Sequence, residues 1–100
     1  MNKQIEHVRT FHEVYEVPML SEPGMPSKER QDLRYKLLFE ELQEYKDACE
    51  KNDLVEVADS LTDLAYILFG TVLEHGLDKH FEAMFEEVQR SNLSKLDNNG

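Results

Sequence analysis

Residues 53–75 read DLVEVADSLTDLAYILFGTVLEH, and this stretch decides the fold. Its first half places Glu56, Asp59 and Asp63 within about 60° of one another around a helix. Its second half, from Leu64 onward, is apolar nearly all round, which is typical of a helix covered on every side. Because a four-helix monomer leaves such a helix partly bare, the stretch predicts that two or more copies of the chain associate.

The flanking sequence predicts further helices, because apolar residues recur there at helical spacing and no stretch alternates with a period of two. Ser27, Asp53 and Asp78 are the expected N-caps, and Gly76 ends the third helix. The expected helices are 2–16, 27–51, 53–75 and 78–90, with a proline-rich loop at 17–26 and a polar, fraying tail at 91–100. The sequence therefore predicts one all-α domain over residues 1–100, a four-helix bundle that forms a dimer or a dimer of dimers.

We expect the apolar residues of the second and fourth helices to face inward. On the second helix the inner side should include Cys49, read as a small core residue. On the fourth helix the residues expected to point inward are Phe81, Met84, Phe85 and Val88.

Composition narrows the classes of partner. Acidic residues outnumber basic ones by 21 to 11, which gives a formal charge of −10. This charge argues against nucleic-acid polymers and acidic membranes as partners, and it suits a protein that binds divalent cations. The longest apolar run, Leu64 to Leu73, is about half the length of a membrane-spanning helix. A single cysteine fits a reducing compartment, so we expect a soluble, cytoplasmic protein.

Two acidic stripes lie on consecutive helices. On the second helix, Glu40, Glu41 and Glu44 fall within about 100° of one another, and the stripe on the third helix runs directly into apolar positions. Carboxylates gathered at one place repel each other unless a cation neutralises them. Because Mg²⁺ prefers hard oxygen ligands and often shares its shell with substrate phosphates, the two stripes indicate a site for metal-dependent phosphate chemistry.

Each stripe also has an ordinary interpretation. Acidic residues at helical spacing usually form a solvated face. Glu56 fits a capping box with Asp53, and Glu40 can pair with Lys36 one turn earlier. The residues alone leave both interpretations open.

The ordered segments add a resemblance. Glu41-x-x-Glu44 followed by Glu56-x-x-Asp59 resembles the metal motif of the MazG-like all-α nucleoside triphosphate pyrophosphohydrolases. Four segments in order resemble the branch related to phosphoribosyl-ATP pyrophosphohydrolase. They are VRTFHEVYEVP (8–18), LLFEELQEY (37–45), DLVEVADSLTDLAYILFGTVLEHGL (53–77) and FEEVQRSNLSKL (85–96).

The resemblance implies hydrolysis of a nucleoside triphosphate to the monophosphate and pyrophosphate by a dimeric or tetrameric helical bundle. It implies four ligands for Mg²⁺, for which Mn²⁺ can substitute: Glu41, Glu44, Glu56 and Asp59. A canonical deoxynucleotide, a damaged nucleotide and a phosphoribosylated nucleotide all remain candidate substrates.

The same resemblance suggests roles for the remaining site residues. Glu40, paired with the adjacent Glu41 in catalysis, would hold a second metal ion or orient the attacking water. The RSNLSK segment would place Asn92 and Lys95 at the substrate. Only eleven residues separate the two halves of the metal motif, fewer than is usual in the family, so Asp63 is an alternative or additional metal ligand.

Two other classes of function compete with this prediction. One is a non-catalytic module that binds nucleotides or cations as a helical dimer, and the other is a purely structural dimerisation bundle. An enzyme turns over a nucleotide, whereas the binding module does not. The structural bundle differs from both because it should show no response to Mg²⁺.

Overall fold

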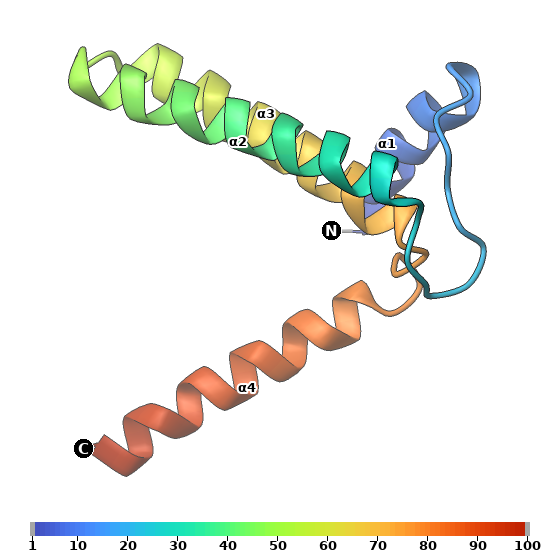
Figure 1. Cartoon of the computed structure of the whole chain (residues 1–100). Helices are drawn as coiled ribbons and strands as arrows, with labels where there is room; N and C mark the ends of the chain where they lie inside the picture. Colours follow the sequence, from blue (N-terminus) through green and yellow to red (C-terminus); the bar gives the residue numbers. More distant parts are fainter. Residues whose placement is uncertain (1, 100) are drawn as a thin grey trace.

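The computed structural model describes residues 2–99, which form four α-helices and no strand. The helices are α1 (Asn2–Val14), α2 (Lys28–Glu50), α3 (Leu54–Glu74) and α4 (Phe81–Asn99). The predicted all-α fold of four helices is thereby confirmed. Helices α2 and α3 form a long antiparallel hairpin, α1 packs on the C-terminal half of α3, and α4 projects away as a second arm (Figure 1).

The predicted caps fix the ends of the hairpin. The Ser27 hydroxyl accepts a hydrogen bond of 3.2 Å from the Arg30 amide, and Asp53 Oδ1 accepts one of 3.1 Å from the Glu56 amide. These bonds satisfy amides that a helix start leaves without a partner. Between the two helices, Asn52 adopts a φ of 54°, a left-handed conformation that asparagine tolerates and that makes the tight turn.

The loop over residues 15–27 is tied to the end of α3. The Gly24 amide donates to the His75 carbonyl over 2.9 Å, and His75 Nδ1 lies 3.0 Å from the Gly24 carbonyl oxygen. Gly76 has a φ of 67°, and a Cβ there would lie 2.2 Å from the Glu22 carbonyl oxygen. Only glycine therefore fits at the expected end of the third helix.

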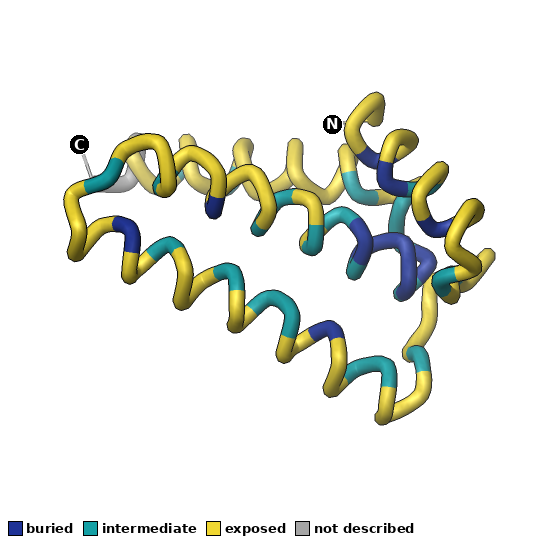
Figure 2. The backbone as a smooth tube through the Cα atoms, turned by 90° about the horizontal axis from the view of Figure 1, so that it is seen from above, coloured by how far each residue is buried: buried dark blue, intermediate teal, exposed yellow. Residues whose placement is uncertain are grey.

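The apolar core is small and lies where α1 crosses α3. Ile5, Val8 and Leu73 are at most 2% exposed, and Met19, Phe69 and Phe81 pack against them. Most of α2 and α4 is exposed by comparison (Figure 2). The isolated chain thus buries little of its apolar surface, as expected for its length.

A buried ion-pair network holds α2 against α3. The Glu74 carboxylate is fully buried and accepts two hydrogen bonds from Arg30, of 3.0 and 2.8 Å. Arg34 Nη1 lies 3.0 Å from the same carboxylate, and its other nitrogens donate to the Thr71 hydroxyl and the Ile67 carbonyl. Because these bonds satisfy both the acid and the guanidinium, the network sets the register between the two helices.

His12 of α1 lies beside this network, near Arg34. Its side chain is buried, and burial together with the positive charge of Arg34 lowers the pKa of His12. A Cβ at Gly70 would lie 2.6 Å from Arg34 Nη2 and 2.9 Å from His12 Nε2. The glycine therefore makes room for the two polar side chains to meet α3.

Helix α4 differs from its prediction at both ends. It begins at Phe81 rather than Asp78, because residues 78–80 form a turn and the Asp78 carboxylate pairs with Arg9 of α1 instead of capping. It continues to Asn99 instead of ending near residue 90. The expected fraying tail was wrong over residues 91–99, since that segment contains neither glycine nor proline to stop the helix.

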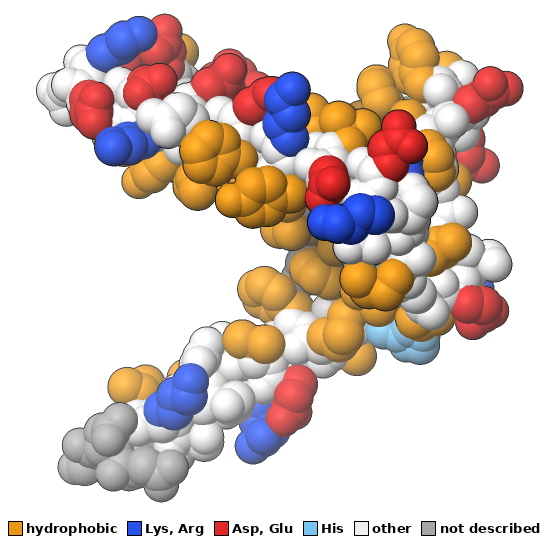
Figure 3. All heavy atoms as spheres, in the orientation of Figure 1, with side chains coloured by type: hydrophobic (Ala, Val, Ile, Leu, Met, Phe, Trp, Pro, Cys, Tyr) orange, Lys and Arg blue, Asp and Glu red, His pale blue; other side chains and the backbone are white. Residues whose placement is uncertain are grey.

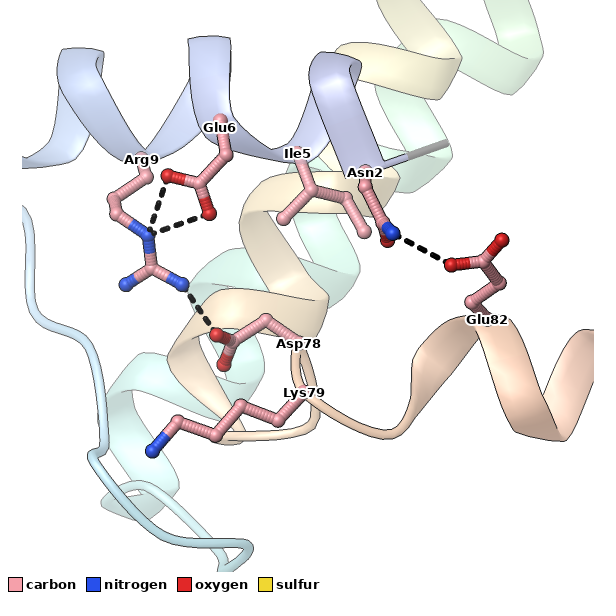
Figure 4. A pocket seen from close by; sticks show the side chains of 7 residues that line it. All are labelled: Asn2, Ile5, Glu6, Arg9, Asp78, Lys79 and Glu82. Atoms are coloured by element: carbon pink, nitrogen blue, oxygen red, sulfur yellow. Dashed lines mark hydrogen bonds and ion pairs between the residues drawn. The ribbon is translucent and has the colours of Figure 1, made fainter.

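Contacts with α1 anchor the start of α4. Arg9 forms ion pairs with Glu6, at 3.2 Å, and with Asp78. The side-chain amide of Asn2 donates a hydrogen bond of 2.6 Å to the Glu82 carboxylate (Figure 4). These residues surround a cavity of about 550 Å³. The paired charges hold the direction in which α4 leaves the core.

The apolar face of α4 is not covered in the single chain, contrary to expectation. Met84, Phe85 and Val88 are 41–56% exposed, because α4 points away from the helices that would have covered them. Cys49, expected in the core, is also exposed. Hydrophobic side chains line the sides of the two arms that are turned toward each other (Figure 3). None of the described helices has the length and apolar character needed to cross a membrane.

Candidate metal and active site

Three carboxylates meet between α2 and α3. Glu41 lies on the side of α2 that faces α3, Glu44 follows one turn later, and Asp63 comes from α3. Each of the three offers an oxygen atom within 4.8 Å of the others, and no other such group of possible metal ligands is found among the described residues. We call these three residues the acidic cluster.

Glu41 is the most strongly perturbed member of the acidic cluster. Burial raises its pKa, and the neighbouring carboxyl groups of Glu44, Asp63 and Glu40 raise it further. Its Oε2 atom is buried and has no hydrogen-bond partner among the described residues. A buried, unpaired carboxylate oxygen is unfavourable. The donor set therefore fits a hard divalent cation, which would supply the missing partner.

A cavity of about 290 Å³ continues from the acidic cluster toward the hairpin turn. Six residues line this cavity, which we call the hairpin cavity: Glu44, Asp47, Lys51, Glu56, Asp59 and Ser60. Glu44 belongs to both the cluster and the cavity, so the two features form one continuous acidic surface. Of the four acids of the predicted metal motif, Glu41 and Glu44 belong to the acidic cluster with Asp63, whereas Glu56 and Asp59 line the hairpin cavity and are not part of the cluster.

The other predicted site residues lie elsewhere. Glu40 is exposed on α2, beside Glu41 in sequence. Asn92 and Lys95 lie on α4, where Lys95 Nζ donates to Asn92 Oδ1 over 3.2 Å. Because α4 forms the second arm of the chain (Figure 1), the fold does not bring Asn92 and Lys95 to the acidic surface of their own chain.

Three residues of the hairpin cavity were not predicted from the sequence: Asp47, Lys51 and Ser60. Asp47 lies three residues after Glu44 and Lys51 lies seven after it, so both follow the same side of α2. Asp47 lines the hairpin cavity but does not belong to the acidic cluster. Ser60 is buried and donates to the Val57 carbonyl over 3.1 Å. Extending the acidic stripe by two more turns would have found the residues on α2.

Comparison with known proteins identifies one matching family. A sequence model of the family described as phosphoribosyl-ATP pyrophosphohydrolase matches residues 8–92. The match includes both halves of the metal motif, the loop between α1 and α2, and the first part of α4. Among curated proteins, none matches the chain.

Proposed function

Because this chain belongs to the phosphoribosyl-ATP pyrophosphohydrolase family, part of the MazG-like all-α superfamily, we propose that it hydrolyses a nucleotide with Mg²⁺. The substrate is a nucleoside triphosphate or a related nucleotide such as a phosphoribosylated one, and the products are the monophosphate and pyrophosphate. The observation that carries the proposal is the acidic cluster, in which the Glu41 oxygen is buried and unpaired. A bound cation would give this oxygen the partner that it lacks.

The acidic surface supplies the ligands in this proposal. Glu41, Glu44, Glu56 and Asp59 hold Mg²⁺ or Mn²⁺, and Asp63 joins them, since its carboxylate lies within 4.8 Å of two of these acids. When bound, the cation neutralises phosphate charge and lowers the pKa of a coordinated water. The hairpin cavity leaves space beside these ligands for the phosphate groups.

Hydrolysis needs a proton acceptor as well as a cation. The water oxygen forms a bond to one of the two phosphorus atoms of the α–β anhydride. The bridging P–O bond to that phosphorus breaks, and the other product, pyrophosphate or the monophosphate, departs with the electron pair. The proton lost by the water passes to Glu40 or Glu41.

We also propose that the working form is a homodimer or homotetramer, in the cytoplasm. The hairpin bears an apolar groove of about 470 Å³, lined by Tyr35, Leu38, Phe39, Leu42, Leu64 and Leu68. Together with the exposed apolar face of α4, this groove leaves large apolar side chains uncovered on both arms, and exposed apolar patches commonly mark protein interfaces. A second copy that fills the space between the arms covers both surfaces, and it lets Asn92 and Lys95 of one chain approach the phosphates held by the other.

A panel of ribonucleoside and deoxyribonucleoside triphosphates and phosphoribosyl-ATP, incubated with Mg²⁺, tests the activity. We expect at least one of them to give the monophosphate and pyrophosphate on chromatographic separation. Binding of nucleotide without turnover would identify a non-catalytic binding module. Failure of every nucleotide in the panel to bind or react would refute the proposed function.

A further inference from the structure

Lys51 stands apart from the other residues that line the hairpin cavity. Four of the six lining residues are acidic, and Lys51 is the one cation among them. A polyphosphate that enters this cavity meets carboxylates whose charge repels it. A cation on the cavity wall is therefore placed to act on phosphate rather than on the protein alone.

The backbone fixes the point from which this side chain extends. Lys51 is the C-cap of α2, and its amide donates to the Asp47 carbonyl over 3.1 Å. The turn at Asn52 then leads directly to the start of α3. From this position the ammonium group of Lys51 crosses to α3, where Nζ lies 4.0 Å from Glu56 Oε2.

This ion pair is loose enough to open. The side chains of Lys51 and Glu56 are 68% and 56% exposed, and exposed pairs at this separation contribute about 0–1 kcal/mol. Lys51 is also well placed relative to the cluster. Seven residues of helix separate it from Glu44, or about 10 Å along α2. A phosphate chain that starts at the acidic cluster and runs through the cavity thus extends toward Lys51.

We propose that Lys51 is a positioning residue that exchanges partners: it pairs with Glu56 in the free protein and with the distal phosphate of the bound nucleotide. This inference rests on the proposed function, because it takes the acidic surface as the place where the phosphates bind. It also assigns a specificity. A nucleotide gains from Lys51 only if it carries phosphates beyond the α-phosphate, so Lys51 discriminates the substrate from the monophosphate product.

If Lys51 exchanges partners in this way, one substitution should strengthen the binding of Mg²⁺ and weaken the binding of a nucleotide. Lys51→Met keeps most of the side-chain length but removes the charge. Without the competing ammonium group, Glu56 is more available to a cation. In thermal melts without nucleotide, the Mg²⁺ concentration that gives half of the full stabilisation should therefore fall about two- to five-fold. Binding of the non-hydrolysable analogue α,β-methylene-ATP with Mg²⁺, measured by calorimetry, should weaken about three- to ten-fold. Binding of AMP should be unchanged.

Lys46→Met is the matched control, because Lys46 is exposed on α2 and is not among the residues that line the hairpin cavity. It should leave all three measurements as in the parent protein. The role of Lys51 would be overturned if Lys51→Met changed the affinities for Mg²⁺ and for the analogue in the same direction. It would also be overturned if AMP binding weakened as much as analogue binding, or if Lys51→Met behaved like the control. So would the absence of any Mg²⁺ response in the parent protein. None of these readouts requires turnover, so loss of the proposed function is detected separately by the nucleotide panel.

Discussion

Replacing Glu41 by glutamine should make the metal-free protein more stable. Glu41→Gln keeps the shape of the side chain but removes a negative charge that lies within 4.8 Å of two other carboxylates. At that distance the repulsion of one pair is about 0.9 kcal/mol in a water-like environment and about 3.5 kcal/mol in the environment typical of a protein surface. Because Glu44 is exposed, we take the lower limit for each pair, which gives about 2 kcal/mol for the two neighbours.

A gain of this size corresponds to a rise in Tm on the order of 10 °C for a domain of this length. The pH dependence follows from the raised pKa of Glu41. An acid whose pKa is raised by folding lowers the stability of the folded state once it ionises there, so the advantage of the variant is present at neutral pH. The advantage should shrink as the pH falls through the folded-state pKa and vanish below the ordinary pKa of glutamate, where the parent carboxyl is protonated in both states.

Thermal melts in a chelator, followed by circular dichroism at matched protein concentration, measure this effect. The same melts with Mg²⁺ should reverse the order, because the parent protein gains about 2.7 kcal/mol at 100 times its dissociation constant and the variant gains much less. Glu86→Gln on the exposed side of α4 is the control and should leave Tm nearly unchanged. If Glu41→Gln melts at or below the parent protein in the chelator, the carboxylates do not repel each other and the argument for a cation fails.

Three further substitutions test the active site, the proposed interface and the buried ion-pair network. Asp59→Asn should abolish nucleotide turnover while circular dichroism shows the helices retained, and turnover as high as in Glu86→Gln would remove Asp59 from the site. Leu68→Glu places a charge on a side chain that is 42% exposed in the single chain, so sedimentation should show a folded monomer where the parent protein is a dimer or larger; an unchanged sedimentation coefficient would contradict the proposed interface. Glu74→Gln leaves Arg30 and Arg34 without their buried partner and should cost about 3 kcal/mol in urea unfolding, whereas a change below about 0.5 kcal/mol would show that the network does not hold the hairpin.

The fold was predictable where local signals agreed with packing. Ser27 and Asp53 are capping residues that stand directly before apolar helical repeats, so the ends of the hairpin were predicted within a residue or two. The start of α4 was not, because Asp78 has the sequence of a cap but pairs with Arg9, 69 residues away. Such a long-range contact overrides a local preference and leaves no local mark in the sequence.

The site was predictable to the level of one helix face. The periodicity of the acids placed Glu41 and Glu44 on the side of α2 that meets α3, but periodicity does not give the register between two helices. That register depends on the buried pairing of Arg34 with Glu74, which no spacing rule indicates. For the same reason Asp63 was known only as an alternative ligand, whereas the structure brings its carboxylate beside Glu41 and Glu44.

In the proposed reaction, the acidic surface binds a divalent cation and the α–β anhydride of a nucleotide is split there. Phosphorus NMR of the parent protein with Mg²⁺ and the best nucleotide of the panel follows each product directly. We predict that the nucleoside monophosphate and pyrophosphate appear in equal amounts, and that neither appears when a chelator replaces Mg²⁺. Release of orthophosphate with the nucleoside diphosphate, or equal rates with and without the chelator, would contradict it.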